Sequence, residues 1–310
     1  MALPLVSIIT VNYNQTQVTC ALLQSIRDQG FRDLEVIVVD NASKENPEGY
    51  LKQHFPEIKF IRSANNLGFA GGNNLGIGTA RGRYLFFVNN DTELTYFCID
   101  RLVGFYEAHP DCGALSPLIC YFNEDSAIGE RIQYAGMTPV SPITARNRII
   151  GEREMDAGQF LVPERTAYAH GAAMMVSRDV LEKVGPMYEQ FFLYYEELDW
   201  CERMRKAGLS IWINPTARIY HKESATVGAN SPLKTYFIHR NRMLFVKRNY
   251  PRTKVAFYVY MWYIVLPKQF IKYGLKLDFK NFKAVWKAMT WHFFGISNTF
   301  ENLVPVVSPK

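Results

Sequence analysis

The chain has 310 residues, enough for one large domain or for a domain of roughly 220 residues with an appended region. An apolar fraction of 48% and a charged fraction of 21% are ordinary for a globular protein and argue against disorder. The net charge of +6 is uneven, because residues from 231 onward carry fourteen Lys or Arg against two acidic residues, and the first 230 are net acidic. A basic tail indicates a phospholipid or nucleic-acid partner, or simply a solvated basic helix.

The cysteines and the apolar runs indicate whether the protein is secreted, membrane-spanning or cytoplasmic. The five cysteines are odd in number and form no C-x-x-C pair, which predicts reduced thiols in a cytoplasmic protein. The start, MALPLVSIITVNYN, lacks the basic segment and cleavage site of a secretory signal. The longest apolar run, residues 255–267, is too short to cross a bilayer, so we expect no transmembrane helix.

The first hundred residues alternate between strand-like and helix-like segments. Short apolar runs, rich in β-branched residues, predict strands at residues 5–13, 34–40, 58–63 and 83–91. Helical spacing predicts helices at residues 15–30, ending at Gly30, and 71–82. Such alternation predicts an α/β fold that binds ligands at the carboxyl ends of its strands.

Residues 120–168 break the alternation, since Ser, Pro, Gly and charges mix there with isolated apolar residues. We expect an irregular insertion on the acceptor side of the site. Strand and helix patterns resume from residue 169 to residue 221, and the chain becomes helical, basic and aromatic after residue 231. The expected domains are therefore a catalytic domain at 1–230 and a helical region at 231–310.

Polar residues follow each of the three core strands where it ends. They are Asn12 and Asn14 after the first strand, Asp40, Asn41 and Ser43 after the second, and Asn89, Asn90 and Asp91 after the third. A single Asn or Asp at such a position is also a common turn former or helix cap. Three strands in succession favour a ligand site at this edge of the sheet.

The segment ANNLGFAGGNNLGIG places Gly71 and Gly72 at an expected helix start, where free N–H groups face an anion. It does not match the G-x-G-x-x-G dinucleotide motif, and the chain contains no G-x-x-x-x-G-K-[ST] motif. Both findings argue against a dehydrogenase or a P-loop NTPase. Asp91 offers an oxygen ligand for Mg²⁺ or Mn²⁺ against a diphosphate. His221 is a candidate second ligand, or else a buried structural histidine.

In combination these segments resemble family 2 glycosyltransferases, specifically the rhamnosyltransferase-like branch. In chain order they are VSIITVNYN, VVDNAS, NNLGFAGGNN, FVNNDTEL, GAAMMVSRDVLEKVG, FFLYYEELDWCERMRKAG, ARIYH and RNRMLFVKRNYP. The resemblance implies a GT-A fold, which is a Rossmann-like mixed sheet flanked by helices. It also implies a nucleotide-diphosphate sugar donor, a divalent metal (Mg²⁺ or Mn²⁺) and inversion at the anomeric carbon.

The resemblance also implies roles for individual residues. The nucleotide contacts are Thr10, Asn12 and Asn14 along the base and ribose, Asp40 and Asn41 at the pyrimidine ring, and Asn66, Gly68, Gly72 and Asn73 over the phosphates. Asp91 matches the last acid of a D-x-D metal motif that reads Asn89, Asn90, Asp91 here, so a single carboxylate would hold the ion. His221 matches the histidine that completes the metal site. Arg240 and Arg242 are expected to pair with diphosphate oxygens, or to be charges on an exposed helix.

The acidic segment after FFLYY carries the expected base. Relatives in the family usually show Glu-Asp where this chain has Glu196 and Glu197. The resemblance therefore implies Glu197 as the base that deprotonates the acceptor hydroxyl, with Glu196 as its neighbour. The alternative is a purely structural acidic helix start. Asp199 and Glu202 are expected to form helix-surface pairs with Arg203 or Lys206.

The tail interleaves lysines with Trp262, Tyr263, Phe270, Trp286, Trp291 and Phe293. This pattern favours a pair of interfacial helices at a membrane, with a packed helical subdomain or a homodimer interface as alternatives. We expect a single-sugar transferase, because the processive Q-x-x-R-W signature is absent. Its expected donor is dTDP-rhamnose or a UDP-hexose or UDP-HexNAc. Its expected acceptor is a glycan or lipid-linked oligosaccharide at the inner face of a bacterial membrane. A nucleic-acid-binding protein and a catalytically inactive scaffold are the competing hypotheses.

Overall fold

The structure is a computed structural model, and it describes residues 5–122, 130–222 and 231–294. Backbone contacts divide the described chain into two compact units. The first takes residues 5–122, 130–139, 147–192 and 196–222, and the second takes residues 140–146, 193–195 and 231–294. The predicted domain boundary after residue 230 and residues 123–129 of the predicted insertion lie outside the described residues.

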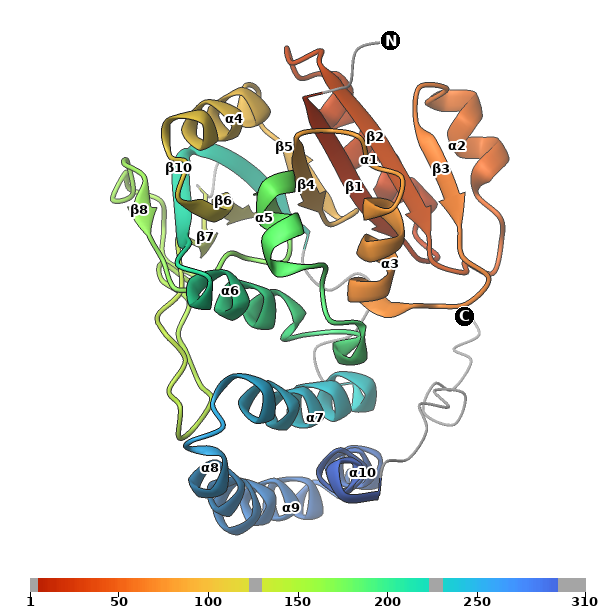
Figure 1. Ribbon diagram of the computed structural model, residues 1–310. Helices are drawn as coiled ribbons and strands as arrows, with labels where there is room; N and C mark the ends of the chain where they lie inside the picture. The colour runs from red at the N-terminus through yellow and green to blue at the C-terminus, as the bar shows by residue number, and fades with distance from the viewer. Residues whose placement is uncertain (1–4, 123–129, 223–230, 295–310) are drawn as a thin grey trace. The chain divides into compact units, whose positions relative to one another are not determined.

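The first unit is built on a mixed sheet in the order β3-β2-β1-β4-β9-β6-β10-β5 (Figure 1). The strands are β1 (Val6–Asn12), β2 (Leu34–Asp40), β3 (Lys59–Arg62), β4 (Tyr84–Val88), β5 (Thr92–Leu94), β6 (Cys112–Tyr121), β9 (Ala173–Ser177) and β10 (Ser210–His221). The first four strands in this order are parallel, and β9 lies antiparallel between β4 and β6. The strands β1, β2 and β4 are largely buried, as their near-continuous apolar runs predict.

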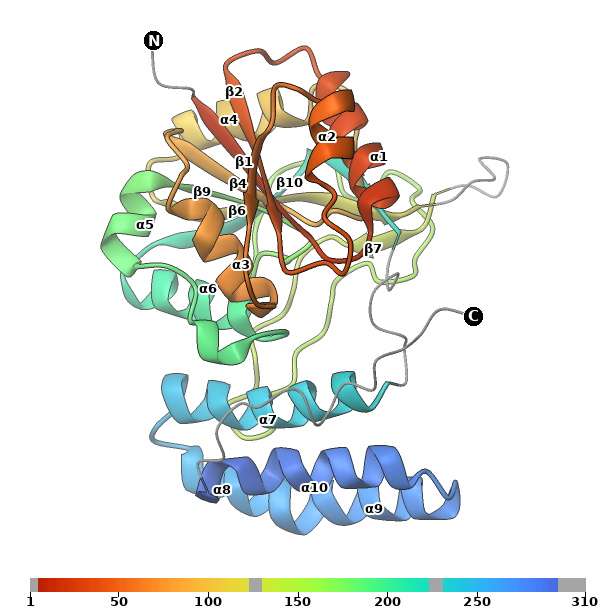
Figure 2. The same ribbon diagram turned by 90° about the vertical axis from the view of Figure 1, so that its right-hand side faces the viewer.

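Helices cover both faces of this sheet: α1 and α2 lie on one side and α3 on the other (Figure 2). The helices of this unit are α1 (Thr16–Arg27), α2 (Glu48–His54), α3 (Gly68–Ile77), α4 (Cys98–Ala108), α5 (Arg178–Val184) and α6 (Glu196–Lys206). The helix α1 buries Leu22, Leu23 and Ile26. The spacing of Val18, Leu22, Ser25 and Gln29 predicts the helix, but of these four residues α1 itself buries only Leu22. The helix α3 begins three residues before the predicted start, at Gly68.

Between β6 and β9 the chain is irregular, as the composition predicts. The described part, from residue 130, holds only the short strands β7 (Ile132–Tyr134) and β8 (Glu164–Arg165). Strand β7 pairs with β6 and β8 pairs with β10, so both extend the sheet locally. The strand β6 itself continues through Tyr121, beyond the predicted start of the insertion.

The second unit is helical. Its elements are α7 (Pro232–Asn249), α8 (Lys254–Tyr260), the π-helical turn η3 (Met261–Val265), α9 (Leu266–Leu275) and α10 (Phe279–Phe294). The helix α7 starts at a capping serine, since the Oγ of Ser231 accepts a hydrogen bond from the N–H of Lys234 at 3.1 Å. Within the described residues, no helix combines the length and the apolar content that crossing a membrane requires.

Candidate active site

A chain of buried hydrogen bonds joins the carboxyl ends of β4, β1 and β2. The Nδ2 of Asn90 donates to the Oγ1 of Thr19 at 3.0 Å, and that hydroxyl donates to the Oδ1 of Asn12 at 2.9 Å. The Nδ2 of Asn12 then donates to the Oδ1 of Asp40 at 2.8 Å. The structure thus brings together polar residues from all three strand ends. Thr19, on α1, is the link that the sequence analysis missed.

The loops after β1 and β2 are also tied to each other. Asn14 has a left-handed backbone, with φ of 57°, and its N–H donates to the Oγ of Ser43 at 2.8 Å. Asp40 is fully buried, accepts a hydrogen bond from the N–H of Ser43 at 3.2 Å and lies 3.5 Å from the Nε of Arg62. Thr10 is buried within β1, and its hydroxyl has no hydrogen-bond partner among the described residues. Hydrogen bonds therefore join the loops after β1 and β2 to each other around Asp40.

The Gly-rich turn is held by Asn41. Its Nδ2 donates to the Oδ1 of Asn66 at 3.0 Å and to the carbonyl of Gly68 at 2.9 Å. Gly68 has φ of +71°, and a Cβ there would lie 2.3 Å from the carbonyl oxygen of Phe192, so only glycine fits. Gly72 lies against β1, and the amide of Asn73 donates to the carbonyl of Phe69 at 3.0 Å within α3.

Asp91 and His221 meet because β10 pairs antiparallel with β5, which places His221 opposite Thr92. The Nε2 of His221 lies 3.1 Å from the Oδ1 of Asp91, and both side chains are largely buried. The Nδ1 of His221 lies 2.8 Å from the Oε1 of Gln133, an atom that only accepts hydrogen bonds.

The oxygen of Gln133 faces Nδ1, which is therefore the ring atom suited to donate a hydrogen bond. The other ring nitrogen, Nε2, faces the carboxylate of Asp91. The Oδ1 of Asp91 is buried without a hydrogen-bond partner among the described residues. The Nε2 of His221 and the Oδ1 of Asp91 are thus a nitrogen and an oxygen ligand atom that face each other, and this donor set fits a divalent metal.

The loop at residues 170–172 lies between the Asp91–His221 pair and α6 and contacts both. The rings of His170 and His221 have centroids 6.3 Å apart, and the carbonyl of Ala172 accepts a hydrogen bond from the N–H of Asn89 at 2.9 Å. A Cβ built on Gly171 would lie 3.8 Å from the carboxyl carbon of Glu197. Burial and the neighbouring His221 lower the pKa of His170 to about 3, so its ring is neutral at physiological pH.

The residues directly before α6, whose first turn is acidic, have a strained backbone. Phe192, Tyr194 and Tyr195 have φ values of 64°, 71° and 76°, in a region that non-glycine residues rarely adopt. Such strain costs of order 1–3 kcal/mol per residue and clusters at functional sites. Directly after it, Glu196 is only 4% exposed, whereas Glu197 is half-buried.

The prediction that Asp199 and Glu202 lie on the helix surface is wrong. Asp199 is fully buried and pairs with the Nε of Arg203 at 3.2 Å. Glu202 is 5% exposed, pairs with Arg205 at 3.0 Å and accepts a hydrogen bond from the hydroxyl of Tyr168 at 2.5 Å. The expected pair of Asp199 with Arg203 does form, whereas Glu202 pairs with Arg205. Both carboxylates are buried because most residues of α6 are buried.

Arg240 and Arg242 belong to the second unit. Arg240 is fully buried, its Nε donates to the Oδ1 of Asn241 at 2.8 Å, and its guanidinium lies 4.8 Å from the ring centroid of Phe237. The Nε of Arg242 donates to the carbonyl of Thr144 at 3.0 Å. Neither is a charge on an exposed helix, so that alternative is wrong. Diphosphate binding by these arginines stays a prediction.

A second set of ligand-type atoms lies at Cys120, Glu130 and Asp156. Arg218 forms ion pairs with both of these carboxylates, and the hydroxyl of Tyr220 donates to Glu130. Burial raises the pKa of the Cys120 thiol to about 12, so the thiol stays protonated. We therefore interpret this cluster as an internal ion pair.

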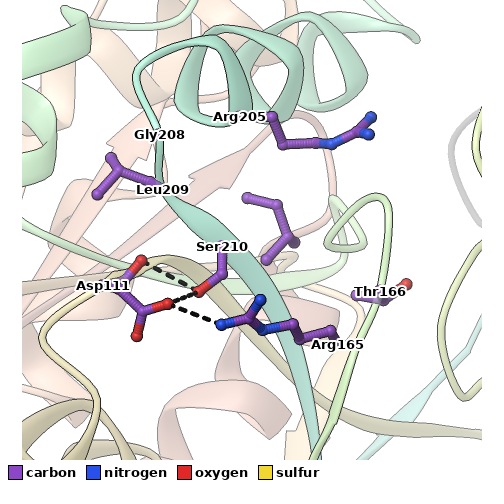
Figure 3. A pocket seen from close by; sticks show the side chains of 8 residues that line it. Asp111, Arg165, Thr166, Arg205, Gly208, Leu209 and Ser210 are labelled. Carbon is purple, nitrogen blue, oxygen red and sulfur yellow. Dashed lines mark hydrogen bonds and ion pairs between the residues drawn. The ribbon is translucent and has the colours of Figure 1, made fainter.

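A surface hollow opens at the first residues of β10 (Figure 3). Its lining residues are Asp111, Arg165, Thr166, Arg205, Gly208, Leu209, Ser210 and Ile211. Arg165 pairs with Asp111 at 3.2 Å, as the dashed line in Figure 3 shows. The hollow lies at the Ser210 end of β10, while His221 ends the same strand. Because sheets of this class bind ligands at the carboxyl ends of their strands, the hollow lies apart from the candidate site.

Solved structures with the same fold are glycosyltransferases. The structure resembles GalNAc-T7 with UDP, GalNAc and Mn²⁺, with a TM-score of 0.65 and 16% identity over 94% of this chain and 56% of that one. It also resembles a mannosyltransferase from Pyrobaculum calidifontis in complex with GDP-Man and Mn²⁺, with a TM-score of 0.58 and 14% identity over 96% of this chain and 89% of that one. The mixed sheet and its flanking helices are thus a GT-A fold, as predicted.

The sequence matches Glycosyl transferase family 2 over residues 7–185, and the chain belongs to this family. It is 28% identical to the low-salt glycan biosynthesis hexosyltransferase Agl10 of Haloferax volcanii, over 77% of this chain and 74% of that protein. It is 24% identical to the dTDP-rhamnosyl transferase RfbF of Shigella flexneri, over 74% and 75%. An N-acetylglucosaminyl-diphospho-decaprenol L-rhamnosyltransferase of Mycobacterium tuberculosis is 22% identical, over 69% and 75%.

Proposed function

We propose that the chain is an inverting, metal-dependent transferase that moves a sugar from a nucleotide-diphosphate donor to a glycan or lipid-linked acceptor in bacterial surface polysaccharide synthesis. The observation that carries the proposal is the convergence of Asp91, His221 and Glu197 on the loop at residues 170–172. A metal-type donor set and a candidate base thus lie around one loop, at an edge where this fold class binds ligands.

The proposed donor is dTDP-rhamnose. Two of the relatives are named as rhamnosyltransferases, and one of these names contains dTDP. A UDP-hexose or UDP-HexNAc is the alternative, which the name hexosyltransferase on another relative supports. Asp40, which Asn12 and Ser43 hold in place, is proposed to accept the N–H of the pyrimidine ring. The turn held by Asn41 is proposed to cover the phosphates.

The proposed metal ligands are the Oδ1 of Asp91 and the Nε2 of His221. A divalent ion there would neutralise charge on the diphosphate leaving group. The contact between Gln133 and the Nδ1 of His221 orients the ring so that Nε2 faces Asp91.

Glu197 is proposed to accept the proton of the acceptor hydroxyl while the new glycosidic bond forms and the bond to the diphosphate breaks. Glu197 is half-buried, whereas Glu196 is nearly inaccessible, so Glu197 is the better placed of the two to meet an acceptor. The strained turn before α6 supports this assignment, because it fixes the direction in which the first helical residues point.

Hydrolysis and transfer assays with dTDP-rhamnose and UDP-sugars test the proposal, with Mg²⁺, Mn²⁺ or a chelator present. We expect metal-dependent turnover of one donor, and a loss of roughly 100-fold or more in Asp91→Ala and in Glu197→Gln. Glu182→Gln, the same chemical change on an exposed residue of α5, is the control and should keep full activity.

Thermal shift with dTDP and UDP, with and without metal, reports binding independently of turnover. Asp91→Ala should remove the metal-dependent part of this shift, whereas Glu197→Gln should keep it. Turnover that survives chelation would refute the metal site, and full activity in Glu197→Gln would refute the base.

A further inference from the structure

The helical run from α8 through η3 to α9 exposes a row of apolar side chains. Val255, Val259, Tyr263, Ile271 and Leu275 have exposed fractions of 75%, 51%, 78%, 63% and 83%. They are separated by four or eight residues, the spacing that places side chains on one side of a helix. We call these five residues the apolar row. Soluble surfaces usually carry large apolar side chains singly, so a row of this length indicates a binding surface.

The π-helical turn Met261–Val265 lies in the middle of this row. Positions four apart drift by about 40° per step around a regular α-helix, because the helix has 3.6 residues per turn. A π-helical turn has more residues per turn than an α-helix, so residues four apart rotate in the opposite direction there and the drift is partly cancelled. The turn therefore helps the residues before and after it to share one side of the run.

Lysines flank the apolar row on the same run. Lys268, Lys272 and Lys276 are all exposed and are also four residues apart, and the last two directly follow Ile271 and Leu275. Residues 254–277 contain no acidic residue. Asp278, which comes next, caps α10, since its Oδ1 accepts a hydrogen bond from the N–H of Asn281 at 3.1 Å. The run is thus both apolar and uniformly basic.

The packing of the second unit does not use the apolar row. Within this unit α10 packs on α7 and α9 packs on α10 (Figure 2). Several aromatic residues predicted for a membrane surface serve this packing instead: Phe270 stacks on Phe282 at 4.1 Å, and Trp291 lies against Arg240. The side chain of Phe293 is outside the described residues. The exposed surface is therefore mostly aliphatic.

We propose that the apolar row and its flanking lysines form a docking surface for an anionic phospholipid bilayer, with the helical run lying in the plane of the interface. The apolar residues enter the acyl boundary, and the lysines remain at the headgroups. A nucleic acid does not match an aliphatic row. A second copy of this chain would bring two lysine rows of like charge together. This inference rests on the proposed function in one respect: a lipid-linked acceptor is the reason why the enzyme would need to bind a membrane.

Vesicle co-sedimentation tests the surface without any donor, acceptor or metal. We expect the full chain to bind vesicles that contain about one third phosphatidylglycerol, to bind phosphatidylcholine vesicles weakly, and to lose binding as salt rises. The triple change of Lys268, Lys272 and Lys276 to Gln should weaken binding on the order of 100-fold, since each basic residue near an anionic surface contributes roughly fivefold. Ile271→Ser combined with Leu275→Ser should weaken it at least about tenfold.

Matched controls lie in the first unit. Leu161→Ser with Val162→Ser removes two apolar residues that are 69% and 62% exposed. Changing the exposed Arg32, Lys44 and Lys183 to Gln removes the same amount of positive charge. Both control variants should bind anionic vesicles as the unchanged chain does, and circular dichroism should show that every variant is folded.

The proposal is overturned if the unchanged chain does not sediment with anionic vesicles at low salt, or if the control variants lose as much binding as the test variants. It is also overturned if ultracentrifugation finds a dimer that the Ile271→Ser, Leu275→Ser change dissolves while vesicle binding is absent. The Asp91→Ala variant should bind vesicles normally. Failure of the membrane surface and failure of the transferase proposal are therefore distinguishable.

Discussion

Single residues define the candidate site through contacts that span long stretches of sequence. His221 is oriented by Gln133, 88 residues earlier, and Asn90 reaches Asn12 only through Thr19. Each of these side chains is buried. A buried polar group that loses its partner costs about 1–3 kcal/mol, so such links are also stability determinants.

Thr19→Val tests the link at the strand ends. Valine keeps the shape of threonine but leaves the Nδ2 of Asn90 without its acceptor and the Oδ1 of Asn12 without its donor. We expect the free energy of unfolding to fall by about 2 kcal/mol, measured by urea denaturation. We also expect weaker nucleotide binding by thermal shift, since Asn12 orients Asp40.

Thr79→Val is the control for this change, because Thr79 is an exposed residue whose hydroxyl donates a hydrogen bond to the carbonyl of Gly76 near the end of α3. It should change the free energy of unfolding by less than about 0.5 kcal/mol. Equal losses in the two variants would show that the hydrogen-bond chain contributes nothing particular to stability.

At the residue scale, the sequence alone predicts which strand ends carry polar groups but not their partners. Asn12, Asp40 and Asn90 follow apolar strands, and the alternation of the chain places such ends together. Thr19, Gln133 and His170 have no local signature, since their roles depend on long-range contacts. Gln133 in particular lies in the irregular segment, where no periodicity indicates which side chains turn inward.

At the scale of elements, α3 packs so closely on β1 and β2 that one of its positions has room only for glycine. A Cβ on Gly76 would lie 2.5 Å from the Cγ2 of Ile9 and 3.3 Å from the Cγ2 of Val39. Any side chain there must push the helix away from β1 and β2. The start of this helix at Gly68 holds the turn proposed to cover the phosphates, so the helix position affects the site.

Gly76→Ala should therefore destabilise the protein by about 1–3 kcal/mol, because the added methyl group overpacks a tight interface. Gly104→Ala, in the middle of α4, is the matched comparison: a Cβ there meets nothing within 4 Å. Alanine has the higher helix propensity, so Gly104→Ala should stabilise by up to about 1 kcal/mol. Urea denaturation of both variants measures the difference, and a loss of stability in both would contradict the packing argument.

Elements themselves were predictable to different degrees. The strands β1, β2 and β4 were predicted from their apolar runs, because strands buried on both faces leave a strong signal. The sequence does not predict that β9 lies antiparallel between β4 and β6, because strand order depends on pairing between distant segments. The early start of α3 depends on the positive φ of Gly68 and its contact with Phe192, neither of which a local pattern reveals.

At the scale of the whole molecule, buried histidines make the fold sensitive to acid. Burial lowers the pKa of His292 to about 4 and also lowers the pKa of His239, both in the second unit. In the unfolded chain a histidine has a pKa near about 6.5. The unfolded state therefore binds more protons than the folded state between about pH 6.5 and 4, and stability falls as the pH is lowered through this range.

We expect the melting temperature to drop between pH 7 and pH 5, by an amount to which His292 alone contributes the equivalent of about 2 kcal/mol. His292→Gln keeps a donor for the carbonyl of Arg240, which the Nε2 of His292 now reaches at 2.9 Å, but cannot take up a proton. This variant should show a smaller drop over the same interval. A flat profile in the unchanged chain, or an identical drop in the variant, would contradict the assignment.

The division of the chain between its two units has a consequence for biosynthesis. Within the described residues, the chain passes from one unit to the other at residues 139/140, 146/147, 192/193 and 195/196. The carbonyls of Leu193 and Tyr194, directly before the acidic helix, accept hydrogen bonds from Asn241, which the ribosome adds nearly fifty residues later. During translation the strand ends that hold Asp40 can form early, while the entry to the helix of Glu197 waits for α7. A chain released before α7 is made would therefore lack the hydrogen bonds from Asn241 to the carbonyls of Leu193 and Tyr194, although the strands that carry Asn12 and Asp40 are already complete.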